Sequence, residues 1–138
     1  MIKKLHQFAY VLACGDPKIR HELSRILDER FGPENYFWMP EFGGVKDIVS
    51  PEIPGDSVRL FRKMATAQKV HPFGLTVVIN HSDCGAYRLA GKTFKDAMDE
   101  ETHHRSELNK SVAWILERFP GAKVETHYFL KKEQKMAW

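Results

Sequence analysis

The chain has 138 residues, 43% hydrophobic and 28% charged, which suits one domain with a buried core spanning residues 1–138. Its net charge of +3 is small and its basic residues are spread out, which argues against nucleic-acid binding. Two cysteines do not make a disulfide scaffold, and no apolar run approaches the ~20 residues of a membrane-spanning helix.

The N-terminus has two interpretations. Lys3 and Lys4 followed by an apolar run have the layout of a secretion signal, and residues 11–14 look like a lipoprotein cleavage box. However, His6 and Gln7 interrupt the start of the apolar run. The remaining run, residues 8–13, is shorter than the ~7–15 residues expected of such a signal. We therefore expect a cytoplasmic protein.

A strand, a helix and a second strand are predicted first. Residues 6–14 form an apolar run typical of a buried strand, after which Asp16 can cap a helix that has Pro17 in its first turn. The apolar residues of this helix follow helical spacing: Ile19, Leu23, Ile26, Leu27 and Phe31. Gly32-Pro33 ends the helix, and residues 36–39 are the second strand.

The next segment is a long connection over residues 39–55, which contains paired glycines and three prolines. A loop of this length in a compact domain either serves a function or covers a sheet edge. Asp56 or Ser57 can cap the second helix, which ends at His71-Pro72.

The remaining elements complete a β-α-β-α-β-α-β pattern. Residues 75–80 are a buried strand, residues 84–91 a turn and short helix, and residues 94–119 a long charged helix. Residues 124–130 are a last strand, and the basic tail at residues 131–135 is predicted to be a solvated terminus. The pattern predicts an α/β fold: a mainly parallel sheet of four or more strands, with helices on both faces.

Candidate metal ligands follow two of these strands. Cys14 closes the first strand, and His81 and Cys84 close the third. Ligands bind at the carboxyl ends of strands in open α/β sheets, and zinc favours thiolate and imidazole ligands. Asp16 is the candidate for the fourth position, either on the metal or hydrogen-bonded to a bound water.

The cysteines have two other interpretations. A cysteine at the end of a buried strand is often only a small apolar residue. A redox pair is the main rival, but Cys14 and Cys84 lack the Cys-x-x-Cys spacing of thioredoxin-like sites. The zinc site is the favoured interpretation.

Several residues near these motifs have more than one possible role. His103 and His104 are predicted to lie on a solvated helix surface, because adjacent helical residues point about 100° apart and form no paired ligand face. Asp83 is expected to cap the following helix. Tyr87 and Arg88 either line a pocket or pack on a partner chain.

The two motifs resemble those of a known family. Cys14 to Lys18 resembles the Cys-x-Asp-x-Arg motif of the β-class carbonic anhydrases, and His81 to Gly85 resembles their His-Ser-x-Cys-Gly motif. The resemblance implies that Cys14, His81 and Cys84 bind Zn²⁺. It also implies reversible hydration of CO2 to bicarbonate by zinc-bound hydroxide, with Asp16 accepting a hydrogen bond from that hydroxide. Family members assemble as homodimers or higher homo-oligomers.

The chain departs from this family at two places. Lys18 stands where the family has the arginine that grips the aspartate and keeps it off the zinc, so Lys18 is the expected stand-in and Arg20 the alternative. Residues 39–44 differ from the family's substrate-pocket stretch. Two alternatives to carbonic anhydrase activity follow: a non-catalytic zinc domain closed by Asp16, or a zinc hydrolase of another small heterocumulene such as carbonyl sulfide.

Overall fold

A mixed five-stranded sheet in the order β2-β1-β3-β4-β5 forms the centre of the computed structural model, which describes residues 8–137. The strands are β1 Ala9–Ala13, β2 Tyr36–Pro40, β3 Leu75–His81, β4 Lys123–Leu130 and β5 Lys135–Ala137. The first four are parallel, and β5 runs antiparallel to β4. The predicted α/β fold with a mainly parallel sheet is confirmed. The lysines of the possible secretion signal lie outside the described residues.

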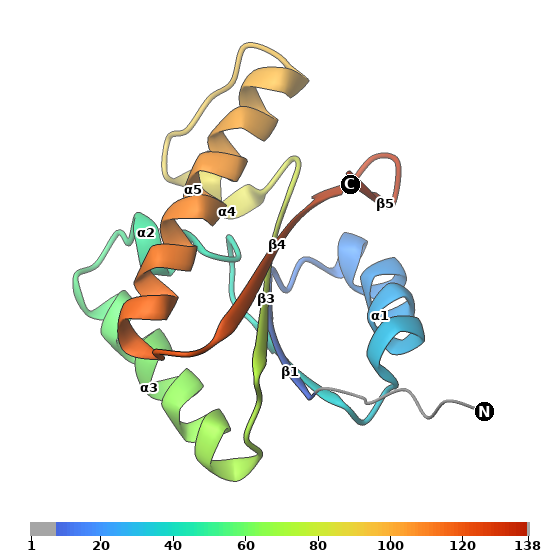
Figure 1. Cartoon of the computed structure of the whole chain (residues 1–138). Helices are drawn as coiled ribbons and strands as arrows, with labels where there is room; N and C mark the ends of the chain where they lie inside the picture. The colour runs from blue at the N-terminus through green and yellow to red at the C-terminus, as the bar shows by residue number, and fades with distance from the viewer. Residues whose placement is uncertain (1–7, 138) are drawn as a thin grey trace.

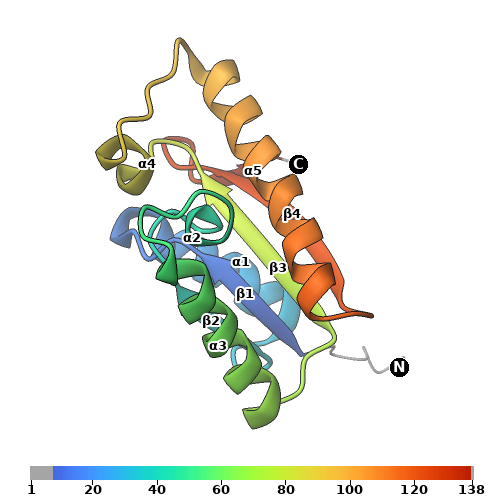
Figure 2. The same cartoon turned by 90° about the vertical axis from the view of Figure 1, so that its left-hand side faces the viewer.

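Helices cover both faces of the sheet, as predicted (Figure 1). Helix α1 lies on one face, and α2, α3 and α5 lie on the other, which is the face turned toward the viewer in Figure 2. Their bounds are α1 Pro17–Phe31, α2 Lys46–Val49, α3 Gly55–Val70, α4 Gly85–Leu89 and α5 Ala97–Arg118. None of the helices within residues 8–137 is both long and apolar enough to cross a membrane.

The central strands β1 and β3 are buried along their whole length. Because successive side chains of a strand point to opposite faces, each strand contributes to two cores. Val11 and Val77 pack with the apolar stripe of α1, whereas Leu12 and Val78 pack with α3 and α5. Burial on both faces explains why these strands are continuous apolar runs rather than alternating ones.

The start of α3 differs from the prediction. The helix begins at Gly55 after Pro54, and no side chain caps it. The backbone of Pro54 is already in the helical region, with φ −54° and ψ −28°, so the chain enters the helix two or three residues earlier than expected. Asp56 instead accepts a hydrogen bond from the Arg59 guanidinium at 2.6 Å.

The basic tail is solvated only in part: Lys132, Glu133 and Lys135 are exposed, but the prediction is wrong for Lys131, whose side chain is 15% exposed. The chain turns after β4 and returns as β5, which places Met136 in the core on the α1 side of the sheet. Arg105 of α5 fixes the returning strand by donating a hydrogen bond to the Ala137 carbonyl at 2.8 Å. A strand of three residues with one buried side chain is too short to give a hydrophobic pattern. We call residues 128–137 the C-terminal hairpin.

Candidate metal centre

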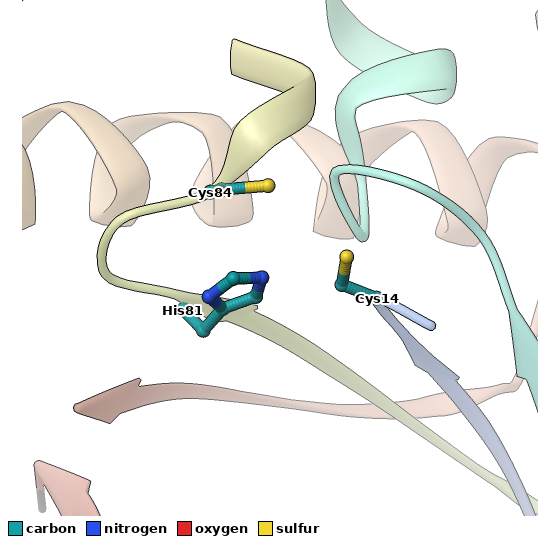
Figure 3. Close-up of side chains that lie close together, drawn as sticks. All are labelled: Cys14, His81 and Cys84. Carbon is teal, nitrogen blue, oxygen red and sulfur yellow. The ribbon is translucent and has the colours of Figure 1, made fainter. Parts of the chain in front are cut away.

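Three potential metal ligands meet at one end of the sheet. Strands β1 and β3 are adjacent and parallel, with Ala13 opposite Ile79, so Cys14 and His81 emerge side by side. Cys84 approaches from the loop that precedes α4. The two sulfur atoms and a ring nitrogen of His81 all lie within 4.8 Å of one another, and all three residues are buried. Figure 3 shows the three side chains pointing into one common space.

His81 is oriented as metal-binding histidines usually are. Its Nδ1 lies 2.6 Å from the backbone carbonyl oxygen of Ser82. Because a carbonyl only accepts hydrogen bonds, Nδ1 carries a proton, and in the neutral ring the lone pair is then on Nε2. Nε2 is buried and has no hydrogen-bond partner in residues 8–137. A bare, buried acceptor beside two thiols fits a metal ion, with Ser82 fixing the ring from behind.

The two thiols interact directly. A hydrogen bond with Cys84 lowers the pKa of Cys14 to about 4, and the same interaction raises the pKa of Cys84 above its usual range. The pair therefore gives up one proton easily and holds the second strongly. A bound cation favours two thiolates, because a coordinating thiol is deprotonated. The residues present thus fit a zinc ion, whose preferred ligands are thiolate and neutral imidazole.

Asp16 lies next to this cluster but is not a member of it. Its Oδ1 accepts a hydrogen bond from the backbone N–H of Lys18 at 2.9 Å, which confirms Asp16 as the cap of α1. Its Oδ2 lies 2.8 Å from the Nζ of Lys131. Partial burial raises the pKa of the Asp16 carboxyl, but the hydrogen bonds and charge of Lys131 outweigh this, so the pKa is lowered overall.

The side chain of Lys18 does not take the position expected of the aspartate's cation. Lys18 and Arg20 are exposed, and neither side chain forms an ion pair with another residue of the described chain. Lys18 contributes its backbone instead, through its N–H to Asp16 and its carbonyl to Gln134. Lys131 is the cation that pairs with the Asp16 carboxylate. Sequence reasoning missed this residue, because it lies far from Asp16 in the chain and belongs to a different supersecondary unit.

The loop before α2, part of the long connection at residues 39–55, is held against the end of β3. Asn80 accepts a hydrogen bond from the backbone N–H of Val45 at 3.1 Å. Gly44 has φ +62°, and a Cβ on it would lie 2.4 Å from the Asn80 Oδ1 and 2.7 Å from the Ile79 carbonyl oxygen. Only glycine combines this conformation with such a close approach. The paired glycines therefore allow the loop to reach the metal centre.

His104 is fully buried, so the predicted solvated surface is wrong for this residue. Its Nδ1 lies 3.0 Å from the side-chain amide nitrogen of Asn80, the same nitrogen that donates to the Tyr87 hydroxyl at 3.1 Å. Burial is the main cause that lowers the pKa of His104, to about 3. His104 lies on the buried face of α5 that includes Leu108, Ser111 and Ile115, whereas His103 is turned partly outward.

Asp83 and Tyr87, which lie close to Cys84 in the sequence, have other roles than those expected. Asp83 does not cap α4, which has no side-chain cap. Its carboxylate instead pairs with Arg88 at 3.2 Å and Lys131 at 3.6 Å. Tyr87 is buried within its own chain, where it packs in the core on the α1 side, so it needs no partner chain for its burial.

A cavity of about 600 Å³ opens beside the cluster, with Cys14 and Asp16 in its wall. Residues of the connection at 39–55 line much of it, and the most exposed apolar side chains of the wall are Phe42, Ile53 and Leu89. An ion pair of 2.7 Å between Glu41 and Lys63 neutralises two of its charged groups. The wall of the cavity beside the centre therefore combines exposed apolar side chains with charged ones.

No protein-family model matches the chain. A protein from Rickettsia conorii, itself uncharacterised, is 29% identical over 140 aligned residues, which cover 91% of this chain and 69% of that protein.

Several solved structures share the fold. A tetrameric β-carbonic anhydrase from the ascomycete Sordaria macrospora has a TM-score of 0.67 at 11% identity, covering 95% of this chain and 79% of that one. A carbonic anhydrase from Streptococcus mutans has a TM-score of 0.62 at 12% identity, covering 95% and 80%. A carbon disulfide hydrolase has a TM-score of 0.60 at 12% identity, covering 95% and 77%. The chain therefore has a β-carbonic-anhydrase-like α/β fold.

Proposed function

We propose that this protein is a zinc-dependent lyase of the carbonic anhydrase type, which interconverts CO2 and bicarbonate. The observation that carries the proposal is the bare, buried Nε2 of His81, which lies within 4.8 Å of the sulfur atoms of two buried cysteines. Cys14, His81 and Cys84 would hold the zinc. The fold shared with carbonic anhydrases adds support, as does the cavity that reaches the cluster.

The residues around the cluster suit this chemistry. A bound zinc ion lowers the pKa of a coordinated water to about 7 and so supplies hydroxide at neutral pH. Asp16 lies in the cavity wall, and its lowered pKa keeps the carboxylate ionised at that pH, so that it can accept a hydrogen bond from the nucleophile and orient it. The Ser82 carbonyl holds the His81 ring in one tautomer. Phe42, Ile53 and Leu89 add apolar surface to the cavity wall, which suits a neutral gas molecule.

The first test is the metal content of protein purified without added metal, measured by elemental mass spectrometry. We expect close to one zinc per chain in the wild type and loss of zinc in Cys84→Ser. Stopped-flow CO2 hydration then tests activity, which Asp16→Ala should abolish while the zinc is retained. Well-folded protein with two free thiols and no zinc would overturn the metal site, and zinc-loaded protein without CO2 hydration would overturn the activity.

A second candidate substrate is another small heterocumulene such as carbonyl sulfide. The exposed apolar side chains of Phe42, Ile53 and Leu89 at the cavity suit a neutral, weakly polar molecule, and a carbon disulfide hydrolase shares the fold. The assay is sulfide release from carbonyl sulfide by the zinc-loaded protein. Sulfide release without CO2 hydration would favour this substrate.

The non-catalytic alternative requires Asp16 as a permanent fourth ligand. In the structure both carboxylate oxygens of Asp16 already have partners, Lys18 N–H and Lys131, and the carboxylate lies outside the ligand cluster. This arrangement supports an enzyme with an open site over a closed structural site.

We further propose that the protein forms homodimers or higher homo-oligomers. Strand β2 is an edge strand of the sheet that residues 8–137 form, and an edge strand can pair with another chain. The β-carbonic anhydrase of Sordaria macrospora with the same fold is tetrameric. Size-exclusion chromatography with light scattering tests this, and a monomer at micromolar concentration would contradict it. The cytoplasmic location expected from the sequence stays a prediction.

A further inference from the structure

The candidate metal centre is assembled from two segments, and a third segment contacts both of them. The first carries Cys14 and Asp16, and the second is the loop from His81 to Cys84. The C-terminal hairpin lies against both: the Lys131 ammonium contacts Asp16 of the first segment, and the Lys131 backbone N–H donates to the Ser82 hydroxyl of the second at 2.8 Å. The hairpin thus lies where it can control the position of Asp16.

Lys131 is held far more firmly than an ordinary surface lysine. Its side chain is only 15% exposed, and the Asp16 side chain it contacts is 16% exposed. The ammonium lies 2.8 Å from Asp16 Oδ2 and donates to the backbone carbonyl of Asp83 at 3.2 Å, with the Asp83 carboxylate 3.6 Å away. The three donors of the ammonium thus have three oxygen atoms within 3.6 Å, which restrain its position.

The hairpin that carries Lys131 is itself anchored. The Gln134 side chain donates to the Lys131 carbonyl at 2.6 Å and to the Lys18 carbonyl at 2.9 Å, which ties the turn to the start of α1. Met136 is buried in the core, and Arg105 holds Ala137. Although a lysine side chain is flexible, the anchored hairpin can therefore hold the Lys131 ammonium beside the Asp16 carboxylate.

We propose that Lys131 is a positioning residue, which keeps the Asp16 carboxylate turned away from the Cys14–His81–Cys84 cluster and available as a hydrogen-bond acceptor. Asp16 is separated from Cys14 by one residue, so its carboxylate needs only a short movement to reach a metal bound there. Lys131 supplies the competing cation. The inference rests on the proposed zinc site but assigns a task to a residue outside the two ligand motifs.

The test uses the full chain loaded with Co²⁺, whose visible absorption reports the coordination of the metal. Thiocyanate is added as an external ligand, and CO2 hydration is measured on the zinc-loaded proteins. The variants are Lys131→Met, Lys131→Arg and the double variant Lys131→Met with Asp16→Ala. Lys132→Met is the matched control, since Lys132 is the neighbouring exposed lysine of the same turn. Circular dichroism checks that each variant is folded.

If Lys131 positions Asp16, Lys131→Met should lose the thiocyanate response, because the freed carboxylate takes the metal position that thiocyanate would occupy. Its CO2 hydration should fall about 10- to 100-fold, as is usual for residues that support metal sites. Lys131→Arg should restore both. The double variant should regain the thiocyanate response, because no carboxylate is left to close the site. It should not regain the activity, because the hydrogen-bond acceptor is also lost.

Two results would overturn the inference. One is a thiocyanate response in Lys131→Met equal to that of the wild type. The other is a double variant that stays as unresponsive as Lys131→Met, which would mean that Lys131 only supports the local fold. Failure of the proposed function is distinguishable from failure of this inference, because it is seen in the wild type itself. The wild type would then bind no cobalt or zinc, or would bind metal without hydrating CO2. The spectroscopic comparison of the variants needs only a bound metal.

Discussion

Asn80 connects β3 with the loop before α2, with α4 and with α5 near the candidate metal centre, and His104 is its partner in α5. Asn80, in β3, uses its amide oxygen for the loop before α2 and its amide nitrogen for His104 of α5 and Tyr87 of α4. An asparagine can satisfy all of these contacts because its amide has both an acceptor and two donors. His104 must stay neutral in this arrangement, since its Nδ1 accepts from Asn80.

His104 should make folding sensitive to acid. Its pKa is about 3 in the folded protein and about 6.5 when unfolded, so below pH 6.5 the unfolded chain binds the extra proton. Stability contributed by neutral His104 is complete above this pH and is lost as the pH falls, by up to ~1.4 kcal/mol per pH unit. Urea unfolding of metal-free protein between pH 7 and 4 measures this.

The comparison for His104 is between two glutamine variants. His104→Gln should flatten the dependence of the unfolding free energy on pH, whereas His103→Gln, which alters a partly exposed neighbour, should keep most of it. Equal slopes in the two variants would contradict the assignment to His104.

Lys18 should be replaceable, because its side chain is exposed and only its backbone contacts Asp16. We expect zinc content and CO2 hydration of Lys18→Met to stay within about 2-fold of the wild type, which is a small change beside the effect of losing a metal-site partner. Stopped-flow hydration measures this. A loss approaching that of Lys131→Met would show that the Lys18 side chain takes part.

At the scale of elements, the turn at Gly44 decides how closely the loop before α2 approaches β3. Gly44→Ala adds a Cβ 2.4 Å from the Asn80 Oδ1 to a residue at φ +62°. Gly121→Ala is the matched control, since Gly121 has φ +87° with nothing within 4 Å of its Cβ position. The control isolates backbone strain, about 1 kcal/mol. Gly44→Ala should cost more, roughly 2–4 kcal/mol in unfolding free energy, because the clash adds to the strain.

Thermal and urea unfolding of the two alanine variants supply this comparison, and CO2 hydration of Gly44→Ala should fall because the loop lines the cavity. Equal stabilities of the two variants would show that the loop relaxes without strain.

Elements with strong periodicity could be predicted from the sequence, and elements fixed by distant contacts could not. The buried strands β1 and β3 and the helix α1 carry clear apolar patterns, and neighbouring parallel strands brought Cys14 and His81 together. Strand β5 has one buried side chain, so it gave no pattern. Lys131 and His104 look solvated among charged neighbours, and only the tertiary packing of the hairpin and of α5 buries them.

At the scale of the whole molecule, the centre connects two strands that lie far apart in the sequence, so zinc should stabilise the fold. Ligands that bind only the folded state add about 2.7 kcal/mol at a free concentration 100-fold above Kd. We expect removal of zinc by a chelator to lower the thermal midpoint and added zinc to restore it. Cys84→Ser should show neither change. A midpoint independent of zinc in the wild type would argue against a site formed on folding.

The C-terminal hairpin also has a consequence for the order of folding. Gln134 and Lys18, which the hairpin brings together, are 116 positions apart in the chain. Contacts between such distant residues require the largest loop closures, and they slow folding. Cys14, His81 and Cys84 are all synthesised before Lys131. We therefore expect a newly made chain to be able to gather its sulfur and nitrogen ligands first and to acquire its restrained aspartate last, so that capture of metal and onset of catalysis are separate events in the maturation of the protein.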